Sequence, residues 1–87
     1  MADGVLVHPR VAERNPDVDT EDVVTAWRQA IGIRRRNFDP PEYYLAAGMD
    51  AKGRLLEMLG VQLEDGSILV FHAMKLTHKA AIELGLG

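Results

Sequence analysis

Apolar residues recur at the spacing of one helix face over residues 20–31, which predicts an amphipathic helix. Asp19 or Thr20 can cap its start, and Gly32 can end it. We expect Trp27 to anchor this helix in the core rather than to serve as a stacking platform, because it shares a face with aliphatic residues. The residues of the apolar stripe are Val23, Trp27, Ala30 and Ile31.

Two shorter helices are expected, one over residues 9–14 and one over residues 77–84. Pro9 suits the first turn of the helix over residues 9–14, because backbone amides in the first turn have no acceptor within the helix and proline lacks the amide hydrogen. Thr77 can cap the latter, and Gly85 can end it. Helices this short depend on packing against the rest of the fold.

The second half of the chain has the pattern of β-strands separated by turns. Residues 50–53 and 64–67 are suited to tight hairpins, because each contains a glycine where a turn needs a left-handed residue. Such short connections force neighbouring strands to be antiparallel. The strands are expected at residues 33–37, 43–49, 54–63 and 67–74, and residues 5–7 can add a short one.

These elements predict a single α+β domain over residues 1–87, since a chain of this length has room for only one thin core. Its sheet is expected to be an antiparallel meander of three to four strands. Two N-terminal helices and a short C-terminal helix complete the predicted fold.

Turn positions fix the register of the meander, and with it the face on which each side chain lies. With a two-residue loop at 65–66 and a three-residue loop at 51–53, Glu57 and His72 become diagonal neighbours on one otherwise apolar face. The same register places Leu63 opposite Ile68, Val61 opposite Val70, Leu59 opposite His72, Glu57 opposite Met74, Met49 opposite Leu55, Ala47 opposite Glu57 and Leu45 opposite Leu59.

A carboxylate and an imidazole within reach of each other can work as an acid–base pair. Glu57 and His72 can equally form a satisfied polar bridge at the end of the core, or extend separately to solvent at the sheet edge. They are the best candidates for chemistry in the chain. An ionisable residue on an apolar face pays a free-energy cost for burying its charge, and this cost must be offset by a charged or hydrogen-bonding partner or by contact with solvent.

The opposite face of the meander is too apolar to be left in water. A helix, a partner chain or a second copy could cover it. We expect a protein interface there, unless the C-terminal helix alone covers the face. The residues assigned to this face are Tyr44, Ala46, Gly48, Arg54, Leu56, Met58, Leu69, Phe71, Ala73 and Lys75.

The net charge of −3 argues against a protein that coats nucleic acid through bulk charge, but the charges are unevenly distributed. Acidic residues dominate the chain up to Asp22, whereas Arg34, Arg35 and Arg36 follow one another with no acid before Asp39. This basic run predicts either a charged strand edge that discourages edge pairing or a contact for an anion or RNA.

Several kinds of site are excluded by composition and spacing. The chain has no Cys, so disulfides and thiolate chemistry are absent. Its glycines are scattered and its histidines lack metal-ligand spacing, so we expect no phosphate loop, no cofactor and no metal site. No apolar run approaches the ~20 residues of a membrane span, so we expect no membrane contact and a cytoplasmic location.

Residues 43–48, 50–56 and 68–77 read YYLAAG, DAKGRLL and ILVFHAMKLT. Together they resemble the strand meander of BrnT-type toxins, which belong to the RelE/ParE superfamily of bacterial type II toxin–antitoxin systems. Residues 13–16 and 20–23 are similar to that family's first helices. The resemblance implies a compact α+β fold, ribonuclease activity on mRNA and neutralisation by an antitoxin protein.

The resemblance carries over to individual residues only in part. Arg54 matches the arginine of the family's Gly-Arg turn, and Ala73 matches the alanine of its Ser-Ala-Arg strand end. His72 stands where that serine would be and Met74 where the arginine would be. Lys75 is the nearest cation that follows.

Metal-free RNA cleavage needs a base for the 2′-hydroxyl, a cation for the phosphorane and an acid for the leaving 5′-oxygen. Glu57 or His72 is the candidate base, and His72 or His78 is the candidate acid. Arg54 and Lys75 are the candidate phosphate clamps. The candidate RNA-binding residues are Arg34, Arg35, Arg36 and Lys79.

Two functions are therefore considered. The first is an mRNA endoribonuclease toxin held in check by an antitoxin. It would be favoured if Arg54, His72 and Lys75 opened into one cleft, and it would fail if they pointed to separate surfaces. The second is a noncatalytic interaction module that binds another protein or forms a homodimer through its second sheet face.

Overall fold

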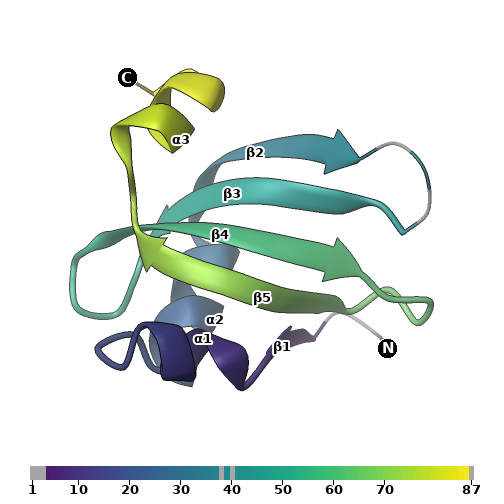
Figure 1. Ribbon diagram of the computed structural model, residues 1–87, viewed down its shortest axis with the longest axis horizontal. Coiled ribbons are helices and arrows are strands. Elements are labelled where there is room, and N and C mark those ends of the chain that lie inside the picture. Colours follow the sequence, from purple (N-terminus) through teal and green to yellow (C-terminus); the bar gives the residue numbers. More distant parts are fainter. Residues whose placement is uncertain (1–3, 38, 40, 87) are drawn as a thin grey trace.

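The computed structural model describes residues 4–37, 39 and 41–86. These residues form one five-stranded sheet with three helices around it (Figure 1). In chain order the elements are β1 (Val5–Val7), α1 (Arg10–Arg14), α2 (Thr20–Arg28), β2 (Ala30–Asn37), β3 (Tyr43–Met49), β4 (Leu55–Gln62), β5 (Ile68–Lys75) and α3 (His78–Glu83).

The α+β class is confirmed, but the sheet is larger than predicted and mixed. Its strand order is β1-β5-β4-β3-β2, so β2 to β5 form the antiparallel meander and β1 is added beside β5. β1 runs parallel to β5, with Val5 opposite Ile68 and Val7 opposite Val70. The prediction of a three- to four-stranded antiparallel sheet is wrong, because no turn reveals the partner of a short strand that pairs across most of the chain.

α1 and α2 cover one face of the sheet and complete the core. Figure 1 shows α2 behind the sheet and α1 alongside β5. The expectation that this face needs a partner chain or the C-terminal helix is wrong, because the two N-terminal helices already bury it. Trp27 packs against this core, as predicted. The buried residues of the core are Val11, Val18, Val23, Ala26, Ala46, Leu56, Met58, Val70 and Ala73.

α2 is shorter than predicted, since it ends at Arg28 rather than at residue 31. Its start is as expected: the Asp19 side chain accepts a hydrogen bond from the Asp22 amide, and the Asp22 side chain accepts one from the Asp19 amide. Ala30 already belongs to β2, and Ile31 is 59% exposed at a bulge instead of lying in the core. Helical spacing alone cannot separate a last helical turn from the start of a strand, and isoleucine favours the strand.

The predicted register is correct along β3 and β4 and at the two ionisable residues of the meander. Leu59 lies opposite His72, and Glu57 lies opposite Met74. All predicted pairs between β3 and β4 also occur. Glu57 and His72 are therefore on one face, as expected.

The register is wrong toward the β4–β5 turn. The Leu63 amide donates to the Ser67 carbonyl, so the loop holds one residue more than predicted. A bulge at Phe71 then shifts the pairing back before the strand reaches His72. Between these two irregularities Val61 lies opposite Leu69 and Gln62 opposite Ile68, in place of the predicted pairs Val61–Val70 and Leu63–Ile68.

Gly48 sets how closely α2 approaches the sheet, and its replacement tests this packing. A Cβ atom at Gly48 would overlap the carbonyl oxygen of Ala26 on α2. We expect Gly48→Ala to lower the free energy of unfolding in urea by about 1–3 kcal/mol, the usual range for overpacking. Gly4→Ala is the control, because a Cβ at Gly4 meets no atom within 4 Å. Equal stability of the two variants would contradict this packing.

Candidate active site

The open face of the sheet, opposite α1 and α2, carries one buried carboxylate, that of Glu57. One of its oxygens accepts hydrogen bonds from the Thr77 amide at 3.0 Å and the Thr77 hydroxyl at 2.6 Å. The other lies 3.0 Å from Nε2 of His72. The carboxylate thus joins β4, β5 and the start of α3, and the predicted proximity of Glu57 and His72 is confirmed.

Hydrogen bonding keeps the Glu57 carboxylate charged. Burial raises the pKa of Glu57, but the hydrogen bonds from Thr77 and His72 outweigh it and hold that pKa below its usual value. A fixed negative charge beside one ring nitrogen favours a proton on that nitrogen. Glu57 therefore orients the His72 ring and assigns the donor role to Nε2.

His72 is placed to exchange a proton with a bound molecule. Its side chain is 28% exposed, so the ring is anchored by Glu57 and still reached by solvent. No hydrogen bond to Nδ1 occurs among the residues that the structure describes. Nδ1 is thus the ring nitrogen left for a ligand.

Two aromatic side chains that contact each other lie on the open face, and one of them, Phe71, directly precedes His72 in β5. Tyr43 and Phe71 meet edge to face, with ring centroids 6.2 Å apart. Phe71 was assigned to the covered face from the sequence, and the β5 bulge moves it to the open one. The sequence holds no signal for that bulge, so an aromatic floor beside His72 was not predicted. Thr77 was recognised only as a helix cap, although it also binds Glu57.

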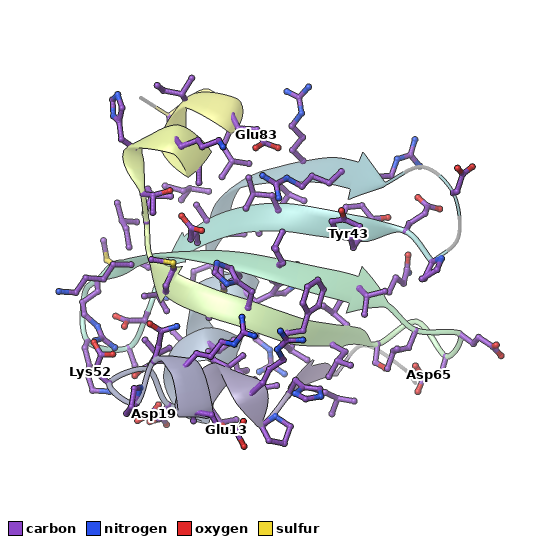
Figure 2. All side chains as sticks on the ribbon, in the orientation of Figure 1. Glu13, Asp19, Tyr43, Lys52, Asp65 and Glu83 are labelled. Carbon is purple, nitrogen blue, oxygen red and sulfur yellow. The ribbon has the colours of Figure 1, made fainter. Side chains whose placement is uncertain are left out.

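The arginines of β2 are engaged by neighbouring groups. Arg36 forms a bidentate ion pair with Glu83 of α3, at 2.8 and 3.0 Å, and Arg34 donates to the Glu83 carbonyl. The hydrogen bond to Glu83 raises the pKa of Arg36, and the negative charge of the same carboxylate adds to this effect. Figure 2 shows Glu83 directed from α3 toward β2. These contacts place α3 at the β2 side of the open face.

Arg35 points the other way and pairs with Glu42 at 2.8 Å, with both side chains largely exposed. Arg34, Arg35 and Arg36 therefore do not form one free basic patch. Their predicted role as RNA contacts would require these partners to be given up.

Arg54 belongs to a second charged cluster, on the side of the sheet that α2 covers. Its guanidinium binds Asp50 at 2.7 Å, Asp22 at 3.1 Å and Asp17 at 3.3 Å. Lys52 binds Asp22 and lies beside Asp19 at the same end of the molecule (Figure 2). The structure thus does not bring Arg54 together with His72. Its contacts fasten the β3–β4 hairpin to the start of α2.

The remaining predicted residues are exposed and scattered. Lys75 pairs with Leu56 at the end of β5, which puts its side chain on the same side as the covered face. His78 and Lys79 lie in the first turn of α3 and are exposed. No hydrogen bond links these three side chains to His72 or Glu57 within the described part of the chain. Arg54, His72 and Lys75 do not share one cleft, so the predicted ribonuclease site that combined all three is wrong. Of the predicted catalytic residues, Glu57 and His72 are the pair that the described structure brings together.

No protein-family model, no curated protein and no solved structure matches this chain. Among residues 4–37, 39 and 41–86, no set of three or more His, Asp or Glu side chains is grouped as metal ligands would be. No helix in the same residues is long and apolar enough to cross a bilayer.

Removal of the Arg54 guanidinium tests the charged cluster at the hairpin. Arg54→Ala leaves the buried Asp50 and Asp22 carboxylates short of partners, so we expect a loss of about 2–4 kcal/mol in the free energy of unfolding. Arg28→Ala is the control, because Arg28 is exposed and carries no such contact in the described chain. A loss of less than about 0.5 kcal/mol for Arg54→Ala would show that the cluster is not stabilising.

The same cluster predicts a pH dependence. Despite burial, which raises it, the pKa of Asp50 is lowered by hydrogen bonds from Arg54 and the Lys52 amide. Stability from this group is fully present above the pKa of an unfolded aspartate and is lost as pH falls through the lowered folded value. We expect wild type to lose stability at acidic pH more steeply than Arg54→Ala, measured by urea unfolding across pH. Parallel curves would contradict the assignment.

Proposed function

We propose that this protein is a toxin-like, metal-independent endoribonuclease that cleaves mRNA on the open face of its sheet. The observation that carries the proposal is the 3.0 Å contact between His72 Nε2 and Glu57 on that face, with the ring partly exposed. A carboxylate that fixes a histidine and leaves its second nitrogen open is the arrangement of a general acid–base catalyst. The resemblance to BrnT-type toxins supplies the substrate class and an antitoxin as the expected protein partner.

The chemistry would use the 2′-hydroxyl of the RNA as the nucleophile. Nδ1 of His72 takes the 2′-hydroxyl proton, and the 2′-oxygen forms a bond to the adjacent phosphorus. The bond from phosphorus to the 5′-oxygen then breaks, and the 5′-oxygen takes the proton back from the imidazolium. The products are a 2′,3′-cyclic phosphate and a 5′-hydroxyl. Glu57 stabilises the imidazolium during the transfer.

The net negative charge of the chain does not prevent RNA from binding to the open face. Much of its surplus of acids lies in the cluster of Asp17, Asp19, Asp22 and Asp50, whose cationic partners in the described part of the chain are Lys52 and Arg54. That cluster is at the hairpin end, on the side covered by α2. Charges on the far side of the sheet are screened over about 8–10 Å at physiological salt.

A second proposal is a noncatalytic interaction module. The observation that favours it is the edge strand β2, where Ile31 is 59% exposed and Ile33 is 56% exposed. Exposed isoleucines on a strand with one unpaired edge are typical of a surface that binds another protein. In this reading, the bridge from Glu57 to Thr77 and His72 serves only to hold α3.

Cleavage of single-stranded RNA by the purified protein, in the presence of a chelator, tests the first proposal. We expect His72→Ala to lower the cleavage rate about 10²- to 10⁴-fold, the usual worth of general acid–base catalysis. Glu57→Gln should lower it by a smaller factor, because the ring stays but loses its charged partner. The wild-type product should carry a 2′,3′-cyclic phosphate.

His8→Ala is the matched control for this experiment. His8 is an exposed histidine whose Nδ1 accepts the Arg10 amide and which lies outside the dyad. Its replacement should leave the rate unchanged. An inactive wild type, or equal losses in His8→Ala and His72→Ala, would overturn the ribonuclease proposal and leave the interaction module.

A further inference from the structure

The structure separates the cations that are already paired from those that are not. Arg34, Arg35, Arg36, Lys52 and Arg54 all bind carboxylates or a carbonyl. Within the described residues, the guanidinium groups of Arg10 and Arg14 have no hydrogen bond or ion pair. Both belong to α1, which the sequence did not single out as a basic element.

α1 is fastened along the part of β5 that carries His72. Just before the helix, the His8 amide donates to the Val70 carbonyl at 2.8 Å. Just after it, the Asn15 side chain donates to the Ala73 carbonyl at 3.0 Å. Val70 and Ala73 stand on either side of His72, so α1 lies beside the strand at the level of the dyad. Figure 1 shows this helix running next to β5.

The positions of Arg10 and Arg14 on α1 are fixed by their neighbours. Val11 is buried in the core and anchors the helix. Glu13 points away from the sheet, as Figure 2 shows. Arg10 and Arg14 are one turn apart, about 6 Å along the axis, and at 100° per residue they fall between the directions of Val11 and Glu13. Two unpaired guanidinium groups therefore stand in a row on one side of α1, at the level of His72 along β5.

We propose that Arg10 and Arg14 bind the phosphates of a single-stranded RNA segment that crosses the open face at His72. This inference rests on the proposed function. Arginine binds phosphate oxygens through paired N–H groups, and these two arginines need not leave another partner to do so. The strand would be single, because the rings of Tyr43 and Phe71, which meet edge to face, can stack on unpaired bases but not on the closed stack of a duplex.

Salt-dependent binding of a non-cleavable oligonucleotide tests this proposal. The probe is a fluorescent single-stranded RNA with 2′-O-methyl groups, which lacks the nucleophile and stays intact. For single strands, each phosphate contact contributes about 0.7 to the slope of log affinity against log salt concentration. We expect Arg10→Ala combined with Arg14→Ala to weaken binding and to lower the slope by about 1.4.

Arg28→Glu is the control matched in charge, since it also makes the net charge more negative by two. Arg28 is the exposed last residue of α2, on the far side of the sheet. It should leave the slope unchanged. An unchanged slope in the double variant, an equal drop in Arg28→Glu, or a wild type that does not bind the probe would overturn the inference.

Cleavage of the unmodified RNA, measured in parallel, separates this inference from the proposed function. A wild type that binds the probe through Arg10 and Arg14 but leaves the RNA intact would sustain the inference and refute the ribonuclease. A wild type that cleaves RNA while the double variant binds normally would refute the inference and sustain the ribonuclease.

Discussion

A carboxylate buried on a sheet face must be given hydrogen-bond donors, and in this protein the donors of Glu57 organise the whole open face. They come from β5 and from the residue that caps α3. Thr77 therefore has two tasks, because its hydroxyl donates to Glu57 and accepts from the Ala80 amide. The Glu57 carboxylate thus fixes the position of α3 and of the His72 ring relative to the sheet.

Buried carboxylates at the β3–β4 hairpin are neutralised in a different way. There the buried carboxylates of Asp22 and Asp50 are matched by the permanent cations Lys52 and Arg54. Such a cluster holds elements together but offers no group that exchanges protons near neutral pH. Glu57 is matched by a hydroxyl, an amide and an imidazole, and the imidazole is the one partner that can change its protonation in function. This difference separates the structural cluster from the candidate active site.

The sequence was informative where local rules decide the outcome. The caps at Asp19 and Thr77, the left-handed Gly53 and Gly66, and the pairing of Leu59 with His72 are all found. The last of these is found because two irregularities cancel, a longer turn and a bulge at Phe71, neither of which the sequence signals.

Features that depend on distant parts of the chain were not predictable. The β1–β5 pairing, the covering of the apolar face by α1 and α2, and the capture of Arg54 by Asp17 and Asp22 all join segments far apart in sequence. Charge counting along the sequence left the Arg34–Arg36 run as either a charged strand edge or a binding surface for an anion or RNA. It could not show that Arg36 forms an ion pair with Glu83 and that Arg35 forms one with Glu42.

The most direct test of the account is the tautomer of the His72 ring, observed in a long-range ¹H–¹⁵N correlation spectrum of the folded protein. The chain has three histidines, and loss of one set of signals in His72→Asn assigns them. In the neutral form of the ring, we expect the proton on Nε2, facing Glu57, and a bare Nδ1. A ring protonated on Nδ1, or one averaging freely between both nitrogens, would contradict the claim that Glu57 prepares His72 for catalysis.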